Sequence, residues 1–512
     1  MYCSVKTATL NGIESIPVTC ESDVSNGLPN FSIVGLLSTE IKESRERVRT
    51  AIKNSKVKFP ASRITVNISP ASIRKSGTGF DLPIAVSILG AYGQIKTSAL
   101  RDIMMIGEMN LTGEILPIKG VLSACLVCKE MNIPYLMVPE GNKYEAAMIP
   151  SLKIIPVKSL KNVIEILKDK EIDERYVWKD DSKVDFKDES YEHDFKDLKG
   201  HKTLRRAMEV AVSGMHNLLM IGPPGAGKTM AASCVPSILP PMSAAEQIEV
   251  SKIYSAAGLL RDHASLINHR PFRSPHHTIS NIGLVGGGGT PIPGEITLAT
   301  SGILFLDELL EFKKESLELL RQPMEDHCIN ISRSKNQVTF PADFMLIAAS
   351  NPCPCGYYPD FNKCECTRSE VHRYLSRLSG PLMDRIDIIV SIHPLTLDEM
   401  SDTHEQESSK EIQKRVIKAM QIQRERFKGT NIEFNSRIPT SQINKYCALS
   451  DSVQKQLLNM LKPENITVRS YNKLLKLART IADLDGSEDI SIKHLKEASN
   501  YIIKGAKCLK IY

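Results

Sequence analysis

Residues 222–229 combine glycine, proline, lysine and threonine in an order that suits the binding of phosphate groups. The segment reads Gly222, Pro223, Pro224, Gly225, Ala226, Gly227, Lys228 and Thr229, directly behind the apolar run 218–221. Glycines let backbone N–H groups converge on phosphate oxygens, and a following helix adds the positive end of its dipole. Lys228 would reach the β- and γ-phosphates, and the Thr229 hydroxyl would bind Mg²⁺. The segment predicts a nucleoside triphosphate site between a strand and a helix.

Two later apolar runs end in polar side chains that could complete this site. The run 303–306 is followed by Asp307 and Glu308, and the run 344–350 by Asn351. If both runs are parallel strands, their carboxyl ends meet at one edge of the sheet. Asp307 would hold Mg²⁺, Glu308 would activate the attacking water as a general base, and Asn351 would orient that water or contact the γ-phosphate. The alternatives are acids that cap the next helix and an asparagine that forms a turn.

Two arginines further along the chain are candidates for contacting the γ-phosphate. Arg385 lies in the segment 382–387, and Arg469 in the segment 468–471. The guanidinium group is always charged and matches phosphate oxygens with two parallel N–H groups. An arginine finger typically accelerates hydrolysis by roughly 10³- to 10⁵-fold. Taken alone, either arginine is better explained as the partner of a surface salt bridge.

Four cysteines cluster shortly after Asn351. They are Cys353, Cys355, Cys364 and Cys366, in the pattern C-x-C, eight residues, C-x-C. Four thiolates so close in sequence can enclose one tetrahedral Zn²⁺, and a shell of four sulfurs leaves no open position, so the predicted zinc is structural. The alternative is four reduced thiols without metal. A metal-held loop at this place could couple the nucleotide state to a surface that contacts the substrate or an adjacent subunit.

The composition bounds the class of protein. A chain of 512 residues with 42% hydrophobic and 24% charged residues is expected to form two to four globular domains. The net charge of +6 is too small to argue for nucleic acid by itself. No signal pattern or membrane-length apolar run is evident, and most cysteines stand alone in apolar contexts. We therefore expect a cytoplasmic protein that does not act in a membrane.

Four blocks divide the chain. Residues 1–170 alternate strand-like runs with helix-like stretches, notably 82–90 and 121–130, and residues 171–195 are dense in charge, which indicates a linker. Residues 196–393 carry the nucleotide chemistry in an alternation of strands and helices, and residues 394–512 are helical. The pattern predicts an α/β protein whose central block binds the nucleotide and whose C-terminal block is a helical lid.

The chain resembles the AAA+ ATPases of the magnesium-chelatase-like group, and specifically the ComM/YifB family. The likeness covers nearly the whole chain and is carried by residues 222–229, 273–277 (RSPHH), 286–308, 349–356 (including NPCPCG) and 378–387. It implies that Asn351 is sensor 1, that Arg385 is an arginine finger acting on a neighbour's ATP, and that Arg469 is sensor 2 in the lid. Arg377 is a lesser candidate for the finger. The resemblance also implies a homo-oligomeric ring, a hexamer.

Members of this class carry two insertions that point into the pore of the ring. The first would hold His276, His277 and the glycine run 286–289, and the second is a predicted hairpin over 329–340 with Arg333 and Lys335 at or near its tip. Basic side chains on such a hairpin suit a phosphodiester backbone. The alternative is an exposed turn whose charge serves solubility. Adjacent histidines rarely both reach one metal, so a structural or pore-loop role is preferred for the pair.

The N-terminal block resembles the Lon protease domain, which has a ribosomal S5 domain 2-like α/β fold. The likeness falls on residues 75–81 and 111–118. The serine and lysine of the protease dyad align with Gly79 and Leu122, so no nucleophile and base are present. We expect no peptidase activity, and instead a role as scaffold, substrate guide or oligomerisation surface.

The resemblance implies an ATP- and Mg²⁺-dependent ring motor on single-stranded or branched DNA, namely a branch-migration helicase serving natural transformation or recombination. The alternative is a chelatase-like or protein-remodelling ATPase that acts on a protein partner. The chelatase alternative is weakened because the chain shows no sign of an integrin-type metal-binding domain. DNA is favoured only by the basic residues Arg333 and Lys335 and by the family likeness.

Overall fold

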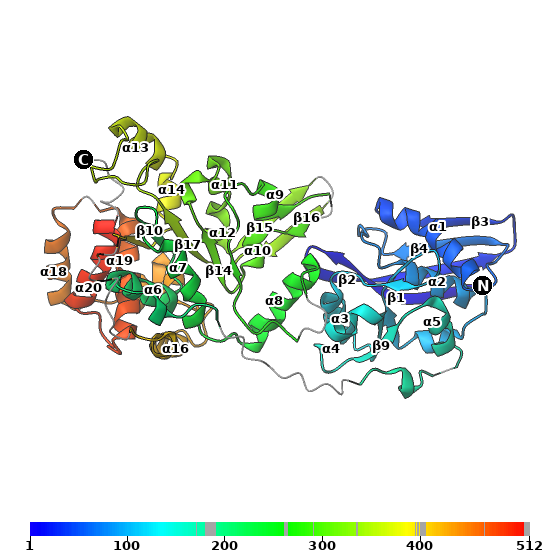
Figure 1. Ribbon diagram of the computed structural model, residues 1–512. Helices are drawn as coiled ribbons and strands as arrows, with labels where there is room; N and C mark the ends of the chain where they lie inside the picture. The colour runs from blue at the N-terminus through cyan, green and yellow to red at the C-terminus, as the bar shows by residue number, and fades with distance from the viewer. Residues whose placement is uncertain are drawn as a thin grey trace.

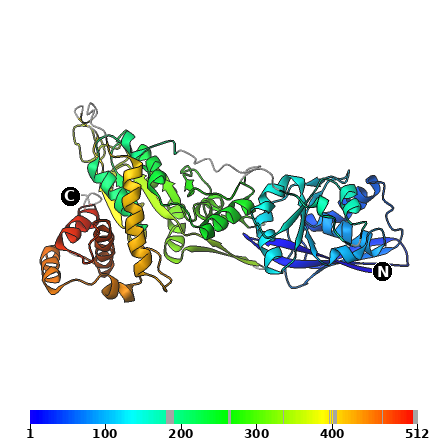
Figure 2. The same cartoon turned by 90° about the horizontal axis from the view of Figure 1, so that it is seen from below.

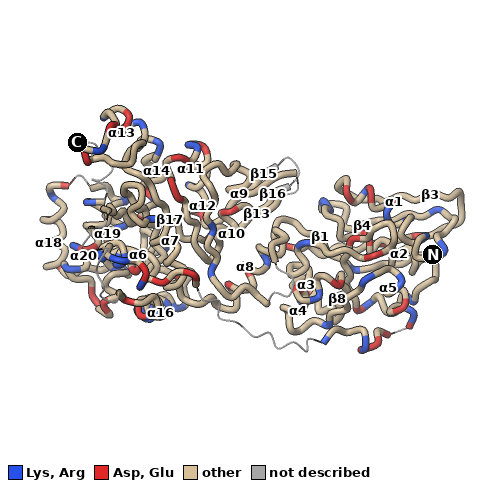
Figure 3. Tube along the Cα trace, in the orientation of Figure 1, with Lys and Arg blue, Asp and Glu red and all other residues tan. Residues whose placement is uncertain are grey.

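The protein is described from a computed structural model, which covers residues 1–169, 171–179, 191–260, 265–289, 291–333, 336–394, 396, 399, 406–464 and 466–505. Two bodies lie side by side and give the molecule an elongated shape (Figures 1 and 2). The N-terminal body is formed by residues 1–169, and the second body joins a central sheet to the C-terminal helices. Acidic and basic residues are interspersed over both bodies (Figure 3), as the small net charge of +6 leads one to expect.

The N-terminal body is built on a seven-stranded mixed sheet in the order β3-β4-β2-β1-β5-β8-β9. Strands β1 and β2 form a long antiparallel hairpin, whereas β1, β5, β8 and β9 are parallel neighbours. The strands are β1 Tyr2–Asn11, β2 Glu14–Ser25, β3 Asn30–Val34, β4 Arg63–Ser69, β5 Ile103–Met105, β8 Tyr135–Pro139 and β9 Lys153–Val157, with a separate short hairpin of β6 Glu108–Met109 and β7 Ile115–Leu116.

The helices of the N-terminal body pack against this sheet, and one of them is apolar on all sides. All eleven residues of α2 are buried, because it lies between α1 and the hairpin β1–β2. The helices are α1 Thr39–Asn54, α2 Asp81–Ala91, α3 Val121–Glu130, α4 Lys143–Ala147 and α5 Leu160–Ile166. The helices expected over 82–90 and 121–130 are thereby confirmed.

The second body contains a five-stranded parallel sheet in the order β11-β14-β17-β10-β18. Its strands are β10 Leu218–Ile221, β11 Phe272–Arg273, β14 Ile303–Leu306, β17 Met345–Ser350 and β18 Ile388–Ser391. Strands β10, β14 and β17 are buried throughout, and continuous apolar runs of this kind are typical of parallel strands covered on both faces. The predicted α/β alternation and its parallel sheet are confirmed.

Short helices and two small hairpins surround the central sheet. The helices are α6 Lys202–Gly214, α7 Lys228–Cys234, α8 Ala244–Ala257, α9 Asn281–Val285, α10 Glu295–Leu298, α11 Lys314–Leu319, α12 Arg321–Asp326, α13 Arg368–Leu375 and α14 Gly380–Met383. One hairpin pairs β15 Cys328–Arg333 with β16 Asn336–Pro341, and the other pairs β12 Gly286–Gly287 with β13 Ile292–Pro293. The hairpin expected over residues 329–340 is therefore present.

The C-terminal part is helical, as expected, and packs on α6 of the central part. Its helices are α16 Ser409–Arg426, α17 Ile443–Tyr446, α18 Asp451–Leu461, α19 Val468–Leu484 and α20 Ile492–Ser499. The apolar side of α19, which includes Leu474, Leu477 and Ile481, is buried against α16 and α6. None of the helices in the described part of the chain is long and apolar enough to cross a membrane.

The two bodies are joined by packing as well as by the chain. The turn between β1 and β2 reaches into the second body, where Ile13 is buried among its core residues. Gly12 lies so close to the hairpin β15–β16 that a Cβ atom on it would be 2.4 Å from Val338 Cγ1. Helix α8 lies beside α3 (Figure 1), and the Gly120 N–H donates to the Ser255 carbonyl at 3.1 Å. The N-terminal body is thus seated on the sheet body at two places.

Candidate nucleotide site

The phosphate-binding segment forms a tight loop between β10 and α7. Gly225 and Gly227 have φ angles of +73° and +78°, a left-handed conformation that glycine adopts without steric cost. Gly222 passes so close to β18 that a Cβ atom would lie 2.6 Å from the Ile392 carbonyl oxygen. Helix α7 then begins at Lys228. The glycines therefore set both the turn and its contact with the neighbouring strand.

Lys228 is held over this loop by three oxygen atoms. Its Nζ donates to the carbonyls of Gly222 at 2.7 Å and Pro223 at 2.9 Å, and to Asn351 Oδ1 at 3.1 Å. Burial lowers the pKa of Lys228, against the charges of Asp307 and Glu308, which raise it. A phosphate chain in the loop would offer the ammonium group charged oxygen partners.

Thr229 and Asp307 form an oxygen pair beside the lysine. The Thr229 hydroxyl donates to Asp307 Oδ2 at 2.6 Å, and the backbone N–H of Glu308 donates to Asp307 Oδ1 at 2.8 Å. Hydroxyl and carboxylate oxygens are ligands that Mg²⁺ prefers, so the pair fits a magnesium ion bound with the phosphates. The structure thus brings together four residues singled out in the sequence, namely Lys228, Thr229, Asp307 and Asn351.

Glu308 stands at the same edge with its side chain largely exposed. Its φ angle is +50°, which is uncommon outside glycine. Its Oε2 atom lies 3.3 Å from Nδ1 of His277, whose ring packs against those of His276 and Phe312. The sequence did not reveal this contact. The available signal was that His277 follows β11, the strand beside β14, so that both strand ends share one edge.

A cavity of about 500 Å³ opens next to the phosphate loop, between residues 200–204 and 391–394. His201 lines it, and the Nε2 atom of this residue is buried with no hydrogen-bond partner among the described residues. A Cβ atom on Gly227 would lie 3.9 Å from that nitrogen. Burial lowers the pKa of His201. No sequence pattern predicted this cavity, whose position suits the base of a nucleotide bound in the loop.

Arg385 and Arg469 lie at the opposite edge of the sheet. Asn217, which precedes β10, donates from Nδ2 to the Arg385 carbonyl at 2.9 Å. The phosphate loop follows the other end of β10, and a strand of four residues spans roughly 13 Å. Arg469 Nη1 pairs with Asp384 at 2.8 Å, and both arginines line one cavity of about 580 Å³. The lid helix α19 therefore carries Arg469 to the side of Arg385 rather than over its own phosphate loop.

Basic and acidic side chains are balanced among the described residues of this second cavity: the basic ones are Arg385, Arg437, Arg469, Lys473 and Lys476, and the acidic ones are Glu325, Asp343, Asp384, Asp387 and Glu433. Burial, followed by the charges of Arg321 and Arg469, lowers the pKa of Arg385. Its guanidinium also pairs with Glu325 and donates to the Pro381 carbonyl at 2.7 Å. Arg385 and Arg469 thus lie close enough for their charges to interact, and each is already paired with a carboxylate, Glu325 or Asp384.

Arg377, the lesser candidate for the finger, lies elsewhere. Its Nη1 donates to the Leu310 carbonyl at 2.6 Å, and its guanidinium carbon lies 5.8 Å from the centre of the Tyr374 ring. Leu310 follows Glu308 by two residues. Arg377 therefore lies at the same edge of the sheet as Lys228 and Asp307 of its own chain, which we call the phosphate edge. Arg385 lies at the opposite edge, which we call the arginine edge.

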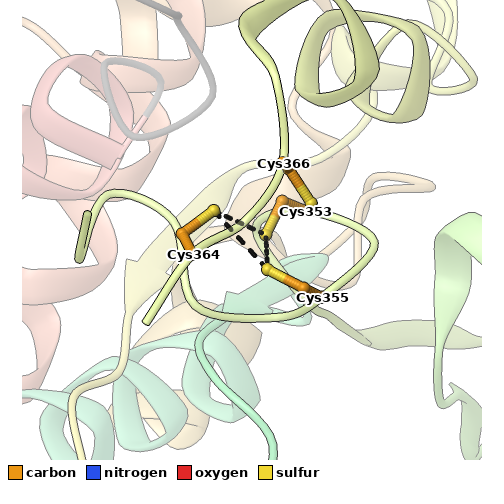
Figure 4. A group of neighbouring side chains, drawn as sticks. All are labelled: Cys353, Cys355, Cys364 and Cys366. Atoms are coloured by element: carbon orange, nitrogen blue, oxygen red, sulfur yellow. Dashed lines mark hydrogen bonds between the residues drawn. The ribbon is translucent and has the colours of Figure 1, made fainter. Parts of the chain in front are cut away.

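The four predicted zinc ligands converge (Figure 4). Their sulfur atoms all lie within 4.8 Å of one another, and three pairs are 3.3, 3.5 and 3.7 Å apart. Zn–S bonds of about 2.3 Å in a tetrahedron place sulfurs roughly 3.8 Å apart, so the set fits Zn²⁺. Burial raises the pKa of Cys364 to about 12 and that of Cys366 to about 11. Burial alone would raise the pKa of Cys355. Hydrogen bonds from the Tyr357 backbone and the other thiols outweigh this effect and lower the pKa to about 6.

The candidate DNA contacts are only partly described. Lys335 lies outside the described residues, and Arg333 is placed at the end of β15 without a described side chain. The glycine run approaches this hairpin, since a Cβ atom on Gly287 would be 3.9 Å from Ile331 Cδ1. The two predicted insertions are thus neighbours, and their contact with DNA stays a prediction.

The residues aligned with the Lon dyad occupy packed positions. Leu122 is buried at the start of α3, and a Cβ atom on Gly79 would be 3.1 Å from Ile118 Cδ1. Ser76 donates to the Leu10 carbonyl at 3.3 Å, and the stem of Lys119 lies against Gly258. Ser76 and Lys119 line one cavity of about 330 Å³ together with Gly79, and the absence of peptidase activity stays a prediction.

A parallel sheet with a phosphate loop and a strand-end aspartate and asparagine defines a P-loop nucleotide-binding protein. Family models match along the chain: "Subunit ChlI of Mg-chelatase" over residues 20–142, "Magnesium chelatase, subunit ChlI" over 194–400, and "Magnesium chelatase, subunit ChlI C-terminal" over 406–502.

Relatives that are similar to the chain over nearly their whole length identify its family within the P-loop proteins. The chain is 40% identical to the protein YifB of Salmonella typhimurium, over 97% of this chain and 96% of that one. It is 39% identical to the competence protein ComM of Haemophilus influenzae, over 96% and 95% of the two chains. The chain belongs to the ComM/YifB family of magnesium-chelatase-like AAA+ proteins, as the motifs indicated. A Lon protease of Mycoplasma mycoides is 25% identical over 30% of the chain, which fits the Lon-like features.

Proposed function

We propose that the protein is an ATP-driven ring motor acting on DNA, a hexameric branch-migration helicase of the ComM type. The motor proposal is supported by one observation, namely that the candidate site residues are divided between two opposite edges of the sheet. Lys228, Asp307 and Asn351 lie at one edge of the sheet, and Arg385 and Arg469 lie at the other. A neighbour that presents its arginine edge to the phosphate edge of this chain would complete each site. Repetition of that head-to-tail contact closes a ring.

The residues at the phosphate edge fit ATP with Mg²⁺, which the family implies. Thr229 and Asp307 would hold Mg²⁺, Lys228 would bind the phosphates, and the cavity beside His201 would take the base. Mg²⁺ supplies positive charge that offsets the charge developing on the phosphates. Glu308 would take a proton from the attacking water, and Asn351 would help to place that water.

DNA as the substrate is supported by two observations. The hairpin β15–β16 ends in residues that include Arg333 and Lys335, and it lies beside the glycine run. The relative from Haemophilus influenzae is a competence protein, so we propose natural transformation or recombination as the process that the motor serves. Basic residues on a hairpin would hold the phosphodiester backbone without reading its sequence.

A second candidate is a motor that remodels a protein partner. It is favoured by the family models, which are named after a magnesium chelatase subunit. In both cases the four cysteines would hold a structural Zn²⁺, since their sulfur separations suit a tetrahedral ion.

The rate of ATP hydrolysis with and without DNA separates these candidates. Purified protein should hydrolyse ATP faster when forked or single-stranded DNA is added at low salt, and the stimulation should fall as salt rises. A variant with Arg333→Ala and Lys335→Ala should lose the stimulation and keep its basal rate. Neither stimulation nor binding of DNA at low salt would contradict the helicase proposal and favour a protein partner.

A further inference from the structure

The loop that carries the four cysteines touches the phosphate-binding loop. Gly356 has a φ angle of +88°, and a Cβ atom on it would lie 2.5 Å from Pro224 Cδ. Pro224 is the third residue of the phosphate loop, at an exposed position. The cysteine loop begins at Cys353, two residues after Asn351, which accepts a hydrogen bond from Lys228. The cluster is therefore linked to the nucleotide site through space and along the chain.

The position of one sulfur fixes the turn that makes this contact. Cys353 is fully buried, and its Sγ accepts the backbone N–H groups of Gly356 at 3.2 Å and Tyr358 at 3.4 Å. The Gly356 N–H is also 3.0 Å from the Cys353 carbonyl. A displacement of this sulfur would shift Gly356, and Pro224 with it.

The far end of the loop is anchored near the same edge. Helix α13 follows Cys366 and begins with a capping box between Thr367 and Glu370. Tyr374 of this helix is buried, and Arg377 just beyond it donates to the Leu310 carbonyl at 2.6 Å. Both ends of the loop are thus tied to segments that carry Asn351 or follow Glu308.

The loop has almost no apolar core of its own. From residue 354 to residue 366 only Gly356 is buried, and two aromatic side chains point outward, Tyr357 at 41% and Phe361 at 74% exposure. A segment of this kind cannot offset its conformational entropy by burial, so a bound metal would supply the free energy that orders it.

We propose that Zn²⁺ bound by Cys353, Cys355, Cys364 and Cys366 holds the loop against Pro224, so that zinc occupancy sets the affinity for the nucleotide. The inference rests on the proposed zinc site. In this role the ion supports the phosphate loop from a distance and takes no part in hydrolysis. Loss of zinc should weaken nucleotide binding because Pro224 and Asn351 lose the loop that positions them.

The first experiment measures zinc content and nucleotide binding on the same samples. The full chain should contain one zinc per chain by mass spectrometry of the metal, and the double variant Cys364→Ser, Cys366→Ser should contain almost none. The variant should bind a fluorescent ATP analogue with Mg²⁺ at least about tenfold more weakly, a change of about 1.4 kcal/mol. Cys328→Ser is the matched control, since Cys328 is partly exposed and lies outside the cluster.

A second variant separates the coupling from the metal site. Gly356→Ala should keep its zinc and still bind the analogue more weakly, because the methyl group collides with Pro224 and strains a left-handed backbone. Gly429→Ala is the control: Gly429 has a φ angle of +79° and no atom within 4 Å of the added carbon, so it carries the strain without the contact.

The outcomes are distinct. Wild-type protein without zinc overturns the metal site. Zinc-depleted variants that bind the analogue as tightly as wild type, with unchanged circular dichroism, overturn the coupling and leave the zinc site standing. Because this binding needs neither DNA nor a ring, failure of the helicase proposal would not affect the result.

Discussion

The two edges of the central sheet differ in how their charges are matched. At the phosphate edge Lys228 has three oxygen partners, and Thr229 is paired with Asp307. At the arginine edge Arg385 and Arg469 share a cavity, and the Nε atom of Arg385 is buried with no partner among the residues that the structure describes. The phosphate edge brings together the residues proposed to hold the phosphates and Mg²⁺, and at the arginine edge Arg385 and Arg469 are each paired with a carboxylate, Glu325 or Asp384. In the proposed ring, the two edges of each chain would be complementary halves of sites shared with its neighbours.

The sharpest test of this division is the removal of Arg385, whose carbonyl contacts Asn217 at the end of β10 opposite to the phosphate loop. Arg385→Ala should lower the rate of ATP hydrolysis by roughly 10³- to 10⁵-fold and leave nucleotide binding by isolated chains nearly unchanged. The rate is measured by phosphate release and binding by the fluorescent analogue. A large loss of binding by isolated chains would place Arg385 in its own site and break the comparison.

Mixing two inactive chains tests the same point from the other side. Lys228→Ala inactivates the phosphate loop of its own chain but keeps Arg385. A ring that mixes it with Arg385→Ala chains therefore contains some interfaces at which an intact loop meets an intact arginine. Activity should return in the mixture, up to a fraction set by how often such interfaces form. Mixed rings that assemble and stay inactive would contradict action between subunits.

Arg469 should show the same behaviour with a smaller effect. A hydrogen bond to a charged group contributes about 1.5–3 kcal/mol, so Arg469→Ala should lower hydrolysis roughly 10- to 100-fold. Mixing with Lys228→Ala should again restore activity, because the lid presents this arginine beside Arg385. Rescue of Arg385→Ala but not of Arg469→Ala would show that the lid serves its own phosphate loop.

The smallest expected effect concerns the histidine that touches the proposed base. His277 Nδ1 lies 3.3 Å from Glu308 Oε2 and competes with water for this carboxylate. An exposed pair of this kind is worth about 0.2–1 kcal/mol, so His277→Ala should raise basal hydrolysis by up to roughly fivefold. His276→Ala is the control, because the His276 ring nitrogen contacts Thr278 instead. An unchanged or lower basal rate in His277→Ala would count against this restraint.

The sequence predicted the phosphate edge well for a physical reason. Each strand there is a continuous apolar run that stops at a polar residue, so Asp307 and Asn351 could be placed at strand ends before the fold was known. The contact between His277 and Glu308 and the approach of His201 to Gly227 were not predicted, because the residues of each pair are distant in sequence. The strand before His277, β11, has only two residues and leaves little periodic signal.

The location of Arg469 depends on packing that no local pattern encodes. The sequence predicted the lid helix correctly, since the apolar side of α19 has a clear helical period. Which edge of the sheet the helix overlies is decided by contacts such as Lys473 Nζ to the carbonyls of Met383 at 3.1 Å and Ile386 at 2.6 Å. These acceptors belong to a turn about ninety residues earlier in the chain.

The seating of the β1–β2 turn in the second body has a mechanical consequence. Ile13 is buried in the core beneath the hairpin β15–β16, and Gly12 touches Val338 of that hairpin. If the hairpin tilts, the turn packed against it would tilt the N-terminal body with it. The largest movement would be at the far end of that body, where β1 begins (Figure 2). In the proposed motor, the outer end of the N-terminal body would then move with each cycle of hydrolysis.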